Sequence, residues 1–461
     1  MMPNDERPAA ASVAPTGARW DGIYDFVRSK LTWARVYRAT SYLKSALWTV
    51  PIIAIVLELL LAPLLRELGG WLHWRFFGFE VSGAESLYQT VITLTLSFLV
   101  FTFGSLLVAI QVAGGQLTPR IIATTLLRDN VVRYSVGLFV FTLFFAVSTL
   151  NRHGASVDEL GAFIAGSLGI ACIVAFLFLI DYAARLLRPV SVVARIGDEG
   201  MVMINSVYPE PAAALTPEAA APLGWPLAPE REVEHIGTSE IVLAVDLSTL
   251  VALARQHDGM IELVPQVGDF VTVEEPLFVL RGGATAIHDR VLRSTVAFGR
   301  ERTLEQDPMF AFRIIIDIAL KALSPAINDP TTAVLALDQV QRLLRTVGKR
   351  QLRGEIIPDP NGQPRVIFRT PNWEDYVQVA CREIRACGAG NLQVARRMRA
   401  MLEDLRRTLP ERRRAVLQQE LDLLNRAIES HFPFAEDLAL ARIPDSQGLG
   451  GSSSTRPASP G

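Results

Sequence analysis

Four long apolar segments occupy the first part of the chain. They are residues 43–65, 88–112, 131–150 and 160–186. Each has about the 20 residues that an α-helix needs to cross the hydrocarbon of a bilayer. The hydrophobic pattern therefore predicts four transmembrane helices and a membrane domain over residues 43–188.

Basic residues gather on one side of these predicted spans. The ends on that side carry Arg35, Arg38, Lys44, Arg120, Arg128, Arg133, Arg185, Arg188 and Arg195. The two loops on the other side hold few basic residues and several acidic ones, Glu67, Glu80, Glu85, Asp158 and Glu159. Because Lys and Arg are retained on the cytosolic side of a membrane, both chain termini are predicted to be cytosolic.

The rest of the chain alternates between soluble elements and linkers. The predicted segments are a disordered N-terminus (1–18), an interfacial amphipathic helix (19–42), a helix with a Pro/Ala-rich linker (189–235), a small β module (236–285), a central helical hairpin (286–350), a β-hairpin (351–371), a helical bundle (372–442) and a disordered tail (443–461). An ordinary soluble helix is the alternative for 19–42. The predicted fold class is thus a four-helix membrane domain joined to a cytosolic α+β region.

The β module contains the sequence Val-Gly-Asp-Phe-Val-Thr-Val-Glu-Glu-Pro-Leu-Phe, residues 267–278. It resembles the turn of lipoyl- or biotinyl-type barrel-sandwich domains, in which alternating apolar residues fill a small β core. Glu274 stands where that pattern has a second glycine. The stretch has no lysine in a Met-Lys-Met-like context, so we predict a structural module without lipoyl, biotin or any other cofactor.

Two helices in the middle of the chain begin with the same signal. Asp307 and Asp329 each precede a proline, which places a capping carboxylate before a proline at the first helical position. The first helix is apolar nearly all round, apart from Arg313, Asp317 and Lys321, which lie four residues apart on one face. These three residues indicate an ion-pair ladder. The alternative is an anion or acidic-headgroup site that would include Arg302.

The turn between these helices is strongly specified by Ser324, Pro325, Asn328, Asp329 and Pro330. Proline disfavours helical geometry in the residue before it, so the first helix should end at Ser324. Asn328 fits a turn position and Asp329 a helix cap. A nucleophilic role for Ser324 with Asn328 and Asp329 as helpers is the weaker interpretation.

Composition removes several function classes. The net charge is −2, which gives no bulk attraction to nucleic acid. The three cysteines and six histidines form neither a disulfide framework nor a metal-ligand pattern. No phosphate-binding loop and no nucleophile elbow is present. The sequence therefore predicts a protein without a bound metal, without a cofactor and without enzymatic activity.

Several motifs together resemble a known family. They are Gln-Leu-Thr-Pro-Arg at 116–120, Arg-Thr at 302–303 with Gln-Asp at 306–307, Asp-Ile-Ala at 317–319, and Ala-Leu-Ser-Pro-Ala-Ile-Asn-Asp-Pro-Thr-Thr-Ala at 322–333. The chain resembles bacterial predicted membrane proteins of domain-of-unknown-function family 2254 from about residue 30 to residue 440. The resemblance implies a bacterial inner-membrane protein. It supplies no activity and no catalytic residues.

The second span carries a narrow small-and-polar stripe. Thr90, Ser97, Gly104 and Gln111 recur every seven residues, which is close to two helical turns. Polar groups within a bilayer usually face protein or water, so the stripe could line a solute path. Small residues also allow helices to pack closely, so helix packing is the alternative.

Glu58 lies within the first span. An ionised carboxylate facing lipid at mid-depth costs roughly 3 kcal/mol on the insertion scale. We therefore expect Glu58 to face other helices or water. A part in proton or cation handling and a tolerated position near the interface are the two interpretations.

The sequence favours a homo-oligomeric channel or passive transporter for ions or small solutes, with a cytosolic domain that regulates or assembles it. Four spans with one polar stripe do not enclose a path alone, so this function requires several copies. The alternative is a membrane-anchored sensor or scaffold that binds an unknown cytosolic partner without transport.

Overall fold

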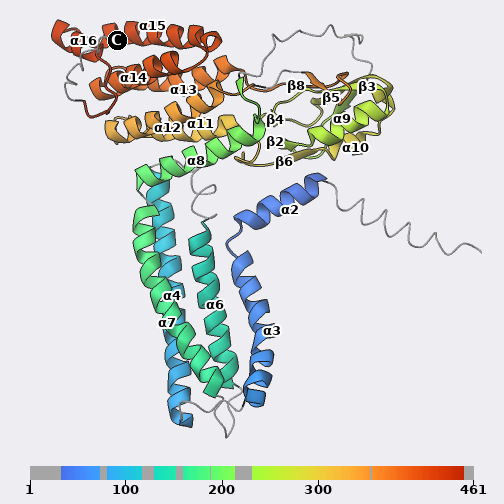
Figure 1. Ribbon diagram of the computed structural model, residues 1–461, viewed down its shortest axis with the longest axis vertical. Helices are drawn as coiled ribbons and strands as arrows, with labels where there is room; N and C mark the ends of the chain where they lie inside the picture. The colour runs from blue at the N-terminus through green and yellow to red at the C-terminus, as the bar shows by residue number, and fades with distance from the viewer. Residues whose placement is uncertain are drawn as a thin grey trace, which may run out of the picture.

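The protein is described by a computed structural model for residues 33–72, 80–116, 129–151, 159–186, 188–212, 231–352 and 356–450. It has two parts (Figure 1). Long helices run side by side in a narrow bundle, and a large domain of helices and two sheets sits at one end of it. The predicted disordered N-terminus and residues 19–32 of the predicted interfacial helix lie outside the described residues. Helix α2 (Trp33–Ser45) covers the end of that segment.

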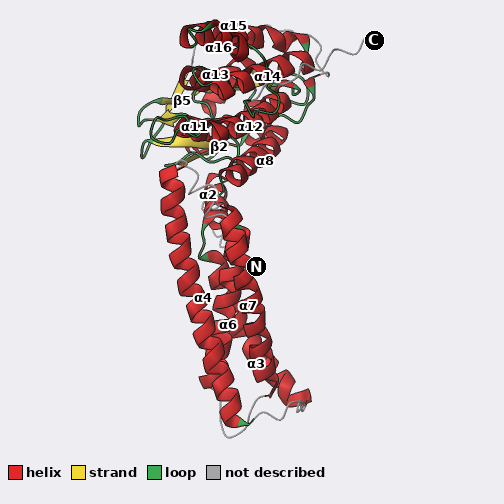
Figure 2. Cartoon of the chain, turned by 90° about the vertical axis from the view of Figure 1, so that its left-hand side faces the viewer, coloured by secondary structure: helices red, strands yellow, loops and turns green. Residues whose placement is uncertain are grey.

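The long-helix bundle consists of α3 (Thr49–Leu72), α4 (Val81–Gln116), α6 (Asn130–Asn151) and α7 (Glu159–Leu186). Of these, α4, α6 and α7 are long and apolar enough to cross a membrane, while the apolar part of α3 is the shorter stretch Thr49–Leu65. Three membrane-spanning helices therefore follow from the structure, and a fourth crossing does not. In Figure 2 the helices of the bundle run nearly parallel along the long axis of the molecule.

Small residues set the spacing inside this bundle. A Cβ atom added to Gly137 would lie 2.6 Å from the side chain of Val50, and one added to Gly169 would lie 3.0 Å from that of Val91. The outer surface carries many exposed apolar side chains, among them Leu60, Phe103 and Leu177. Exposed apolar residues over the length of such helices are what contact with lipid requires.

Helix α8 (Pro189–Val207) lies across the end of the bundle and connects it to the large domain (Figure 1). It begins at Pro189, whose fixed φ suits the first helical position. Its glycines bring it close to the helices above. A Cβ added to Gly197 would meet Gln339, and one added to Gly200 would meet Ala311 and Leu343. The helix is therefore part of the core of the large domain.

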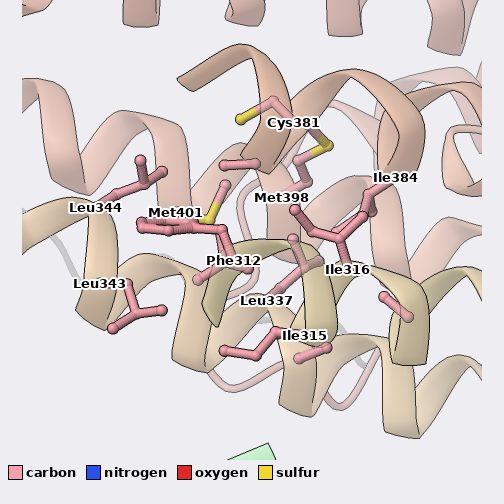
Figure 3. Close-up of a cluster of buried hydrophobic side chains, with 14 of the residues drawn as sticks. Phe312, Ile315, Ile316, Leu337, Leu343, Leu344, Cys381, Ile384, Met398 and Met401 are labelled. Carbon is pink, nitrogen blue, oxygen red and sulfur yellow. The ribbon is translucent and has the colours of Figure 1, made fainter. Parts of the chain in front are cut away.

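The helical part of the large domain contains α11 (Pro308–Ala322), α12 (Pro330–Gly348), α13 (Trp373–Gly388), α14 (Leu392–Thr408), α15 (Arg414–His431) and α16 (Ala435–Ala441). Their apolar faces form one core, in which Phe312, Ile316, Leu337 and Met401 interdigitate (Figure 3). Helix α11 is buried on most of its surface, as its sequence predicts. Both predicted caps are present, since Asp307 accepts from Phe310 N and Asp329 from Thr332 N.

The β part contains two sheets, and the predicted barrel-sandwich module is not confirmed. A mixed five-stranded sheet has the order β1 (Arg231–Glu234), β5 (Pro276–Gly282), β3 (Gly259–Leu263), β8 (Pro364–Phe368), β7 (Ile356–Pro358). A three-stranded sheet has the order β4 (Phe270–Val271), β2 (Glu240–Val245), β6 (Val296–Gly299). Two short helices, α9 (Leu247–Gln256) and α10 (Asp289–Arg293), connect strands.

This β part extends beyond the predicted limits of 236–285. The predicted hairpin at 351–371 joins it because β8 pairs in parallel with β3, with Ile261 opposite Val366. Strand β6, from the predicted helical hairpin, pairs with β2. Local patterns do not specify such distant pairings. Glu274 has φ +70°, a left-handed conformation, where the barrel-sandwich pattern has glycine.

The predicted disordered tail also begins too early. Residues 443–450 lie against α14, because the buried guanidinium of Arg396 donates to the carbonyl oxygens of Ile443 and Gly450, each across 3.0 Å. The Asp445 carboxylate accepts from the backbone N–H groups of Gln447, Gly448 and Gly450. Polar partners thus hold a segment whose Gly/Ser-rich sequence gave no sign of order.

Candidate functional site

The polar residues of α4 lie together on a face that points away from the other described elements of the chain. We call this the polar face of α4 and define it as Ser86, Gln89, Thr90, Thr93, Ser97, Gly104 and Gln111, all of which are exposed. The opposite side of α4 is buried in the bundle through Tyr88, Val91, Thr95 and Leu99. The seven-residue spacing predicted a common face, and the structure places that face outside the single-chain bundle.

Packing within the chain does not explain the polar face. A Cβ atom added to Gly104 would have no heavy atom within 4 Å, so no neighbour in the described chain requires a glycine there. The hydroxyls of Thr90, Thr93 and Ser97 donate to the backbone carbonyls four residues earlier, at 2.7, 2.8 and 2.7 Å. Each hydroxyl keeps its acceptor sites for an outside partner.

Ser86 and Gln89 belong to this face and were not among the predicted site residues. The predicted span began at residue 88, whereas α4 begins at Val81. Ser86 lies seven residues before Thr93, in a row beside the predicted one, whose own extension toward the N-terminus reaches Gly83. The helix also continues to Gln116, four residues beyond the predicted end of the span.

The other end of α4 reaches the large domain. Ile110 is partly buried against the helical core of that domain, one residue before Gln111 of the polar face. Tyr182 of α7 packs against the same core. These two contacts link the bundle, including the helix that carries the polar face, to the core of the large domain.

A polar cluster at this junction joins three helices. The carboxylate of Asp129 caps α6 by accepting from Val131 N and Val132 N. Its other oxygen accepts from the Tyr182 hydroxyl at 2.6 Å and from the Arg195 guanidinium at 2.8 Å. Burial alone would lower the pKa of Arg195, but its hydrogen bonds to Asp129 and Tyr182 outweigh burial and raise that pKa. Sequence analysis missed this cluster.

Glu58 of α3 is buried, with only 2% of its surface exposed. Its position agrees with the expectation that this carboxylate faces other helices, and α3 packs mainly against α6. Within the described part of the chain, Glu58 Oε1 has no hydrogen-bond partner. Glu58 lies apart from the polar face of α4, so the two features form separate sites.

The predicted ionic stripe on α11 is part of a wider ion-pair group. The Arg313 guanidinium donates to Asp317 across 2.7 Å and to both carboxylate oxygens of Glu383 on α13, across 2.7 and 2.9 Å. Hydrogen bonding to Arg313 lowers the pKa of Glu383. Lys321 makes no ion pair among the described residues. The stripe therefore ties α11 to α13 through Arg313.

Arg302 is separate from this stripe. Its guanidinium pairs with Asp307 at 2.8 Å and lies over the Phe310 ring, 5.6 Å from the centroid. Burial raises the pKa of Asp307, and the charge of Arg302 opposes that rise. The four residues that the anion-site interpretation grouped together thus belong to two different structural features.

The turn between α11 and α12 has the structural roles that its sequence predicts. Ser324 Oγ donates to the Lys321 carbonyl, and Asn328 adopts φ +49°. Asp329 N donates to the Ala322 carbonyl across 2.8 Å, and the Asp329 side chain caps α12. Pro325, Ala326, Ile327 and Asn328 at the tip are exposed. The turn is a preformed surface feature with no catalytic arrangement among its own residues.

A polar cavity of about 320 Å³ lies between α2, α8, α9 and the start of α11. Trp33, Asp246 and Asp307 line it together with Arg369. Its two aspartates are already engaged, since Asp246 caps α9 and Asp307 caps α11. Among the residues that the structure describes, no group of three or more His, Cys, Asp or Glu side chains could hold a metal ion.

Long apolar helices with lipid-facing side chains, joined to a folded polar domain, define the chain as a membrane protein. Comparison with known families agrees. The chain belongs to the family of predicted membrane proteins DUF2254, whose model matches residues 44–404.

Curated relatives include uncharacterised proteins of Mycobacterium bovis (strain ATCC BAA-935 / AF2122/97) and of Mycobacterium tuberculosis (strains H37Rv and CDC 1551). Each is 27% identical over 93% of this chain and 84% of its own length. No solved structure matches the chain.

Proposed function

We propose that this protein is a homo-oligomeric channel or passive transporter in the bacterial inner membrane, with the polar face of α4 lining the path for ions or small solutes. The observation that carries the proposal is the outward orientation of that face. It holds two glutamine amides and several hydroxyls on a helix that is long enough to span a bilayer.

Contact with lipid is energetically unfavourable for a face with this many polar side chains. Polar side chains within a membrane usually face a protein interior or a water-filled cavity. The bundle covers the other side of α4, and no described residue covers the polar face, so its partner in this proposal is another copy of the chain. Several copies arranged around a common axis would bring their α4 helices together and enclose water between them.

The proposed orientation places both termini and the large domain in the cytosol, as the distribution of Arg and Lys favours. It includes α3 as a fourth crossing. The large domain would then regulate or assemble the path, because Ile110 of α4 and Tyr182 of α7 pack against its core. The cluster of Asp129, Tyr182 and Arg195 would transmit movements of α8 to α6 and α7.

Oligomeric mass and solute flux test this function together. The purified protein in detergent should form a closed assembly of three or more copies, measured by native mass spectrometry, and should conduct ions in a planar bilayer. Gly104→Leu should reduce conductance while the assembly remains, because the added side chain meets nothing within its own chain. A strictly monomeric protein without conductance would overturn the proposal.

A membrane-anchored sensor or scaffold is the second candidate function, and the exposed turn between α11 and α12 favours it. Pro325, Ala326 and Ile327 form an exposed tip whose shape is fixed by Ser324, Asn328 and Asp329. A rigid exposed turn can serve a protein partner with little loss of entropy on binding. An intact assembly without conductance, in which Gly104→Leu changes nothing, would support this second function.

A further inference from the structure

Glu58 lies on the side of α3 that packs into the long-helix bundle. Residues 50, 54, 58 and 62 recur every four positions, so they share one side of the helix. Val50 lies against Gly137 of α6, Ala54 is buried, and Ala62 packs against a buried apolar cluster formed by α4, α6 and α7. The carboxylate therefore stands between two small apolar residues on the inward side of α3.

This carboxylate has no counter-charge among the described residues. Glu58 is 2% exposed, and its Oε1 atom has no hydrogen-bond partner there. The charged residues whose side chains are described on α3 and on the helices around it all lie toward helix ends: Glu67, Glu85, Arg133, Glu159, Asp181 and Arg185. Arg133 donates to the Thr49 hydroxyl, nine residues and about 13.5 Å of helix before Glu58.

The other titratable side chains inside the bundle bring no charge to this place. Tyr88 of α4 belongs to the apolar cluster that Ala62 contacts. Cys172 Sγ of α7 donates to Thr142 Oγ1 of α6 across 3.3 Å. Phenol and thiol groups are mostly protonated, and therefore neutral, near pH 7. The described part of the bundle thus supplies no positive charge that would compensate an ionised Glu58.

Two kinds of ligand could neutralise the buried carboxylate, a metal cation or a proton. Ca²⁺ and Mg²⁺ take about six or more oxygen ligands. Ala54 and Ala62, one turn before and one turn after Glu58, supply no side-chain oxygen, and the described residues contain no group of three or more His, Cys, Asp or Glu that could hold a metal. A proton needs no such shell, and a buried acid without a counter-charge normally takes one up.

We propose that Glu58 is a proton-binding site inside the bundle, at which the carboxyl group carries a proton in the folded protein. Loss of this proton would leave an unpaired charge between α3 and α6, so binding of the proton is coupled to the packing of these two helices. The site requires only that α3 packs against α6 as observed. It therefore stands or falls independently of the proposed conduit.

Infrared spectroscopy of the full-length protein at pH 7, in a detergent without ester groups, tests the protonation state directly. The carbonyl stretch of a protonated carboxylic acid lies at higher frequency than the bands of amides and carboxylates. Wild type should show such a band, which should shift when the protein contains ¹³C-labelled glutamate and should be absent from Glu58→Gln. A wild-type spectrum without a protonated-glutamate band would overturn the proposal even if the variant does not fold, as would a band that persists in Glu58→Gln.

Thermal unfolding in the same detergent gives an independent measurement. Glu58→Gln replaces a neutral acid by a neutral amide of nearly the same shape, so the unfolding midpoint should stay within about 2 °C of wild type. The matched control is Asp129→Asn, because Asp129 is also buried in the bundle but pairs with Arg195. This control should lose at least about 4 °C, since it leaves the Arg195 charge poorly compensated.

The direction of any change in Glu58→Gln decides between the protonated and the ionised group. A loss as large as that of Asp129→Asn would mean that a positive charge compensates an ionised Glu58. A gain of similar size would mean that the folded protein buries an ionised and unpaired carboxylate. Either result would overturn the proposal, whereas an unchanged midpoint beside a destabilised Asp129→Asn would support it.

Discussion

The Arg195 guanidinium lies 2.8 Å from Oδ2 of Asp129 and joins α8 of the large domain to the first turn of α6 in the bundle. The Asp129 side chain is only 3% exposed, while that of Arg195 is 30% exposed. Solvent therefore partly screens the charge of Arg195, whereas the Asp129 carboxylate is shielded from solvent. A movement of the large domain relative to the bundle that separates α8 from α6 would therefore break this ion pair.

Replacing Arg195 by Met should destabilise the protein by about 2 kcal/mol. Removing one member of a buried pair leaves the other charge poorly compensated, and partial exposure of Arg195 reduces the full effect. Thermal unfolding in detergent measures the loss. The control is Arg185→Met at the exposed pair with Asp181, which should change stability by less than about 0.5 kcal/mol. Equal effects of the two substitutions would contradict a structural role for the junction.

Arg313 should matter more for stability than Asp317. Asp317→Ala leaves Arg313 bonded to both oxygens of Glu383, so the expected loss is about 1 kcal/mol. Arg313→Met removes the ion pairs with both Asp317 and Glu383 and should cost about 2 kcal/mol. Thermal unfolding of both variants checks the order. If Asp317→Ala were the more harmful change, Asp317 and not Arg313 would be the centre of the group.

Stability should fall in acid partly through Glu383. Arg313 lowers the pKa of Glu383 in the folded protein, so folding favours the ionised form. The contribution is fully present above the ordinary glutamate pKa of about 4.3 and is lost as the pH falls through the lower, folded-state value. Melting temperatures measured from pH 7 to pH 3 should therefore drop less in Glu383→Gln than in wild type. Parallel curves would show that this pair does not contribute.

The segment at residues 443–450 should depend on Arg396. Arg396→Met removes the donor of two partly buried hydrogen bonds, to the carbonyl oxygens of Ile443 and Gly450, each worth about 0.5–1.5 kcal/mol. We expect faster proteolysis within 443–450 and a lower melting temperature. The exposed Arg382, changed to Met, serves as the control and should leave both unchanged. An unaltered cleavage rate in Arg396→Met would mean that other contacts hold the segment.

Local signals in the sequence predicted local structure well. Asp307 and Asp329 cap α11 and α12 because a carboxylate before proline specifies a helix start within a few residues. The seven-residue period of Thr90, Ser97 and Gly104 placed them correctly on one face. It could not tell whether that face lies inside or outside the bundle, since this depends on which helices pack against it.

Contacts between distant residues could not be predicted in this way. Glu383 lies 70 residues from Arg313, and Arg195 lies 66 residues from Asp129. No periodic pattern links such positions. The same reason explains why β8 was assigned to an isolated hairpin and not to the sheet that contains β3. The ordered structure of residues 443–450 was not predicted because it depends on Arg396, which lies in α14, about 50 residues earlier in the chain.

The central claim is that the polar face of α4 meets water between copies of the chain, and cysteine accessibility tests it most directly. The background is Cys387→Ser, since Cys172 and Cys381 are buried and Cys387 is exposed. Ser97→Cys lies on the polar face, and Phe103→Cys is the control on an exposed apolar side of the same helix. A membrane-impermeant maleimide is applied to the protein in vesicles.

Because the thiolate reacts and forms only in water, Ser97→Cys should be labelled at least about tenfold faster than Phe103→Cys. Slow and equal labelling at both positions would place Ser97 in lipid or in dry protein contact, and would contradict a water-filled path along α4.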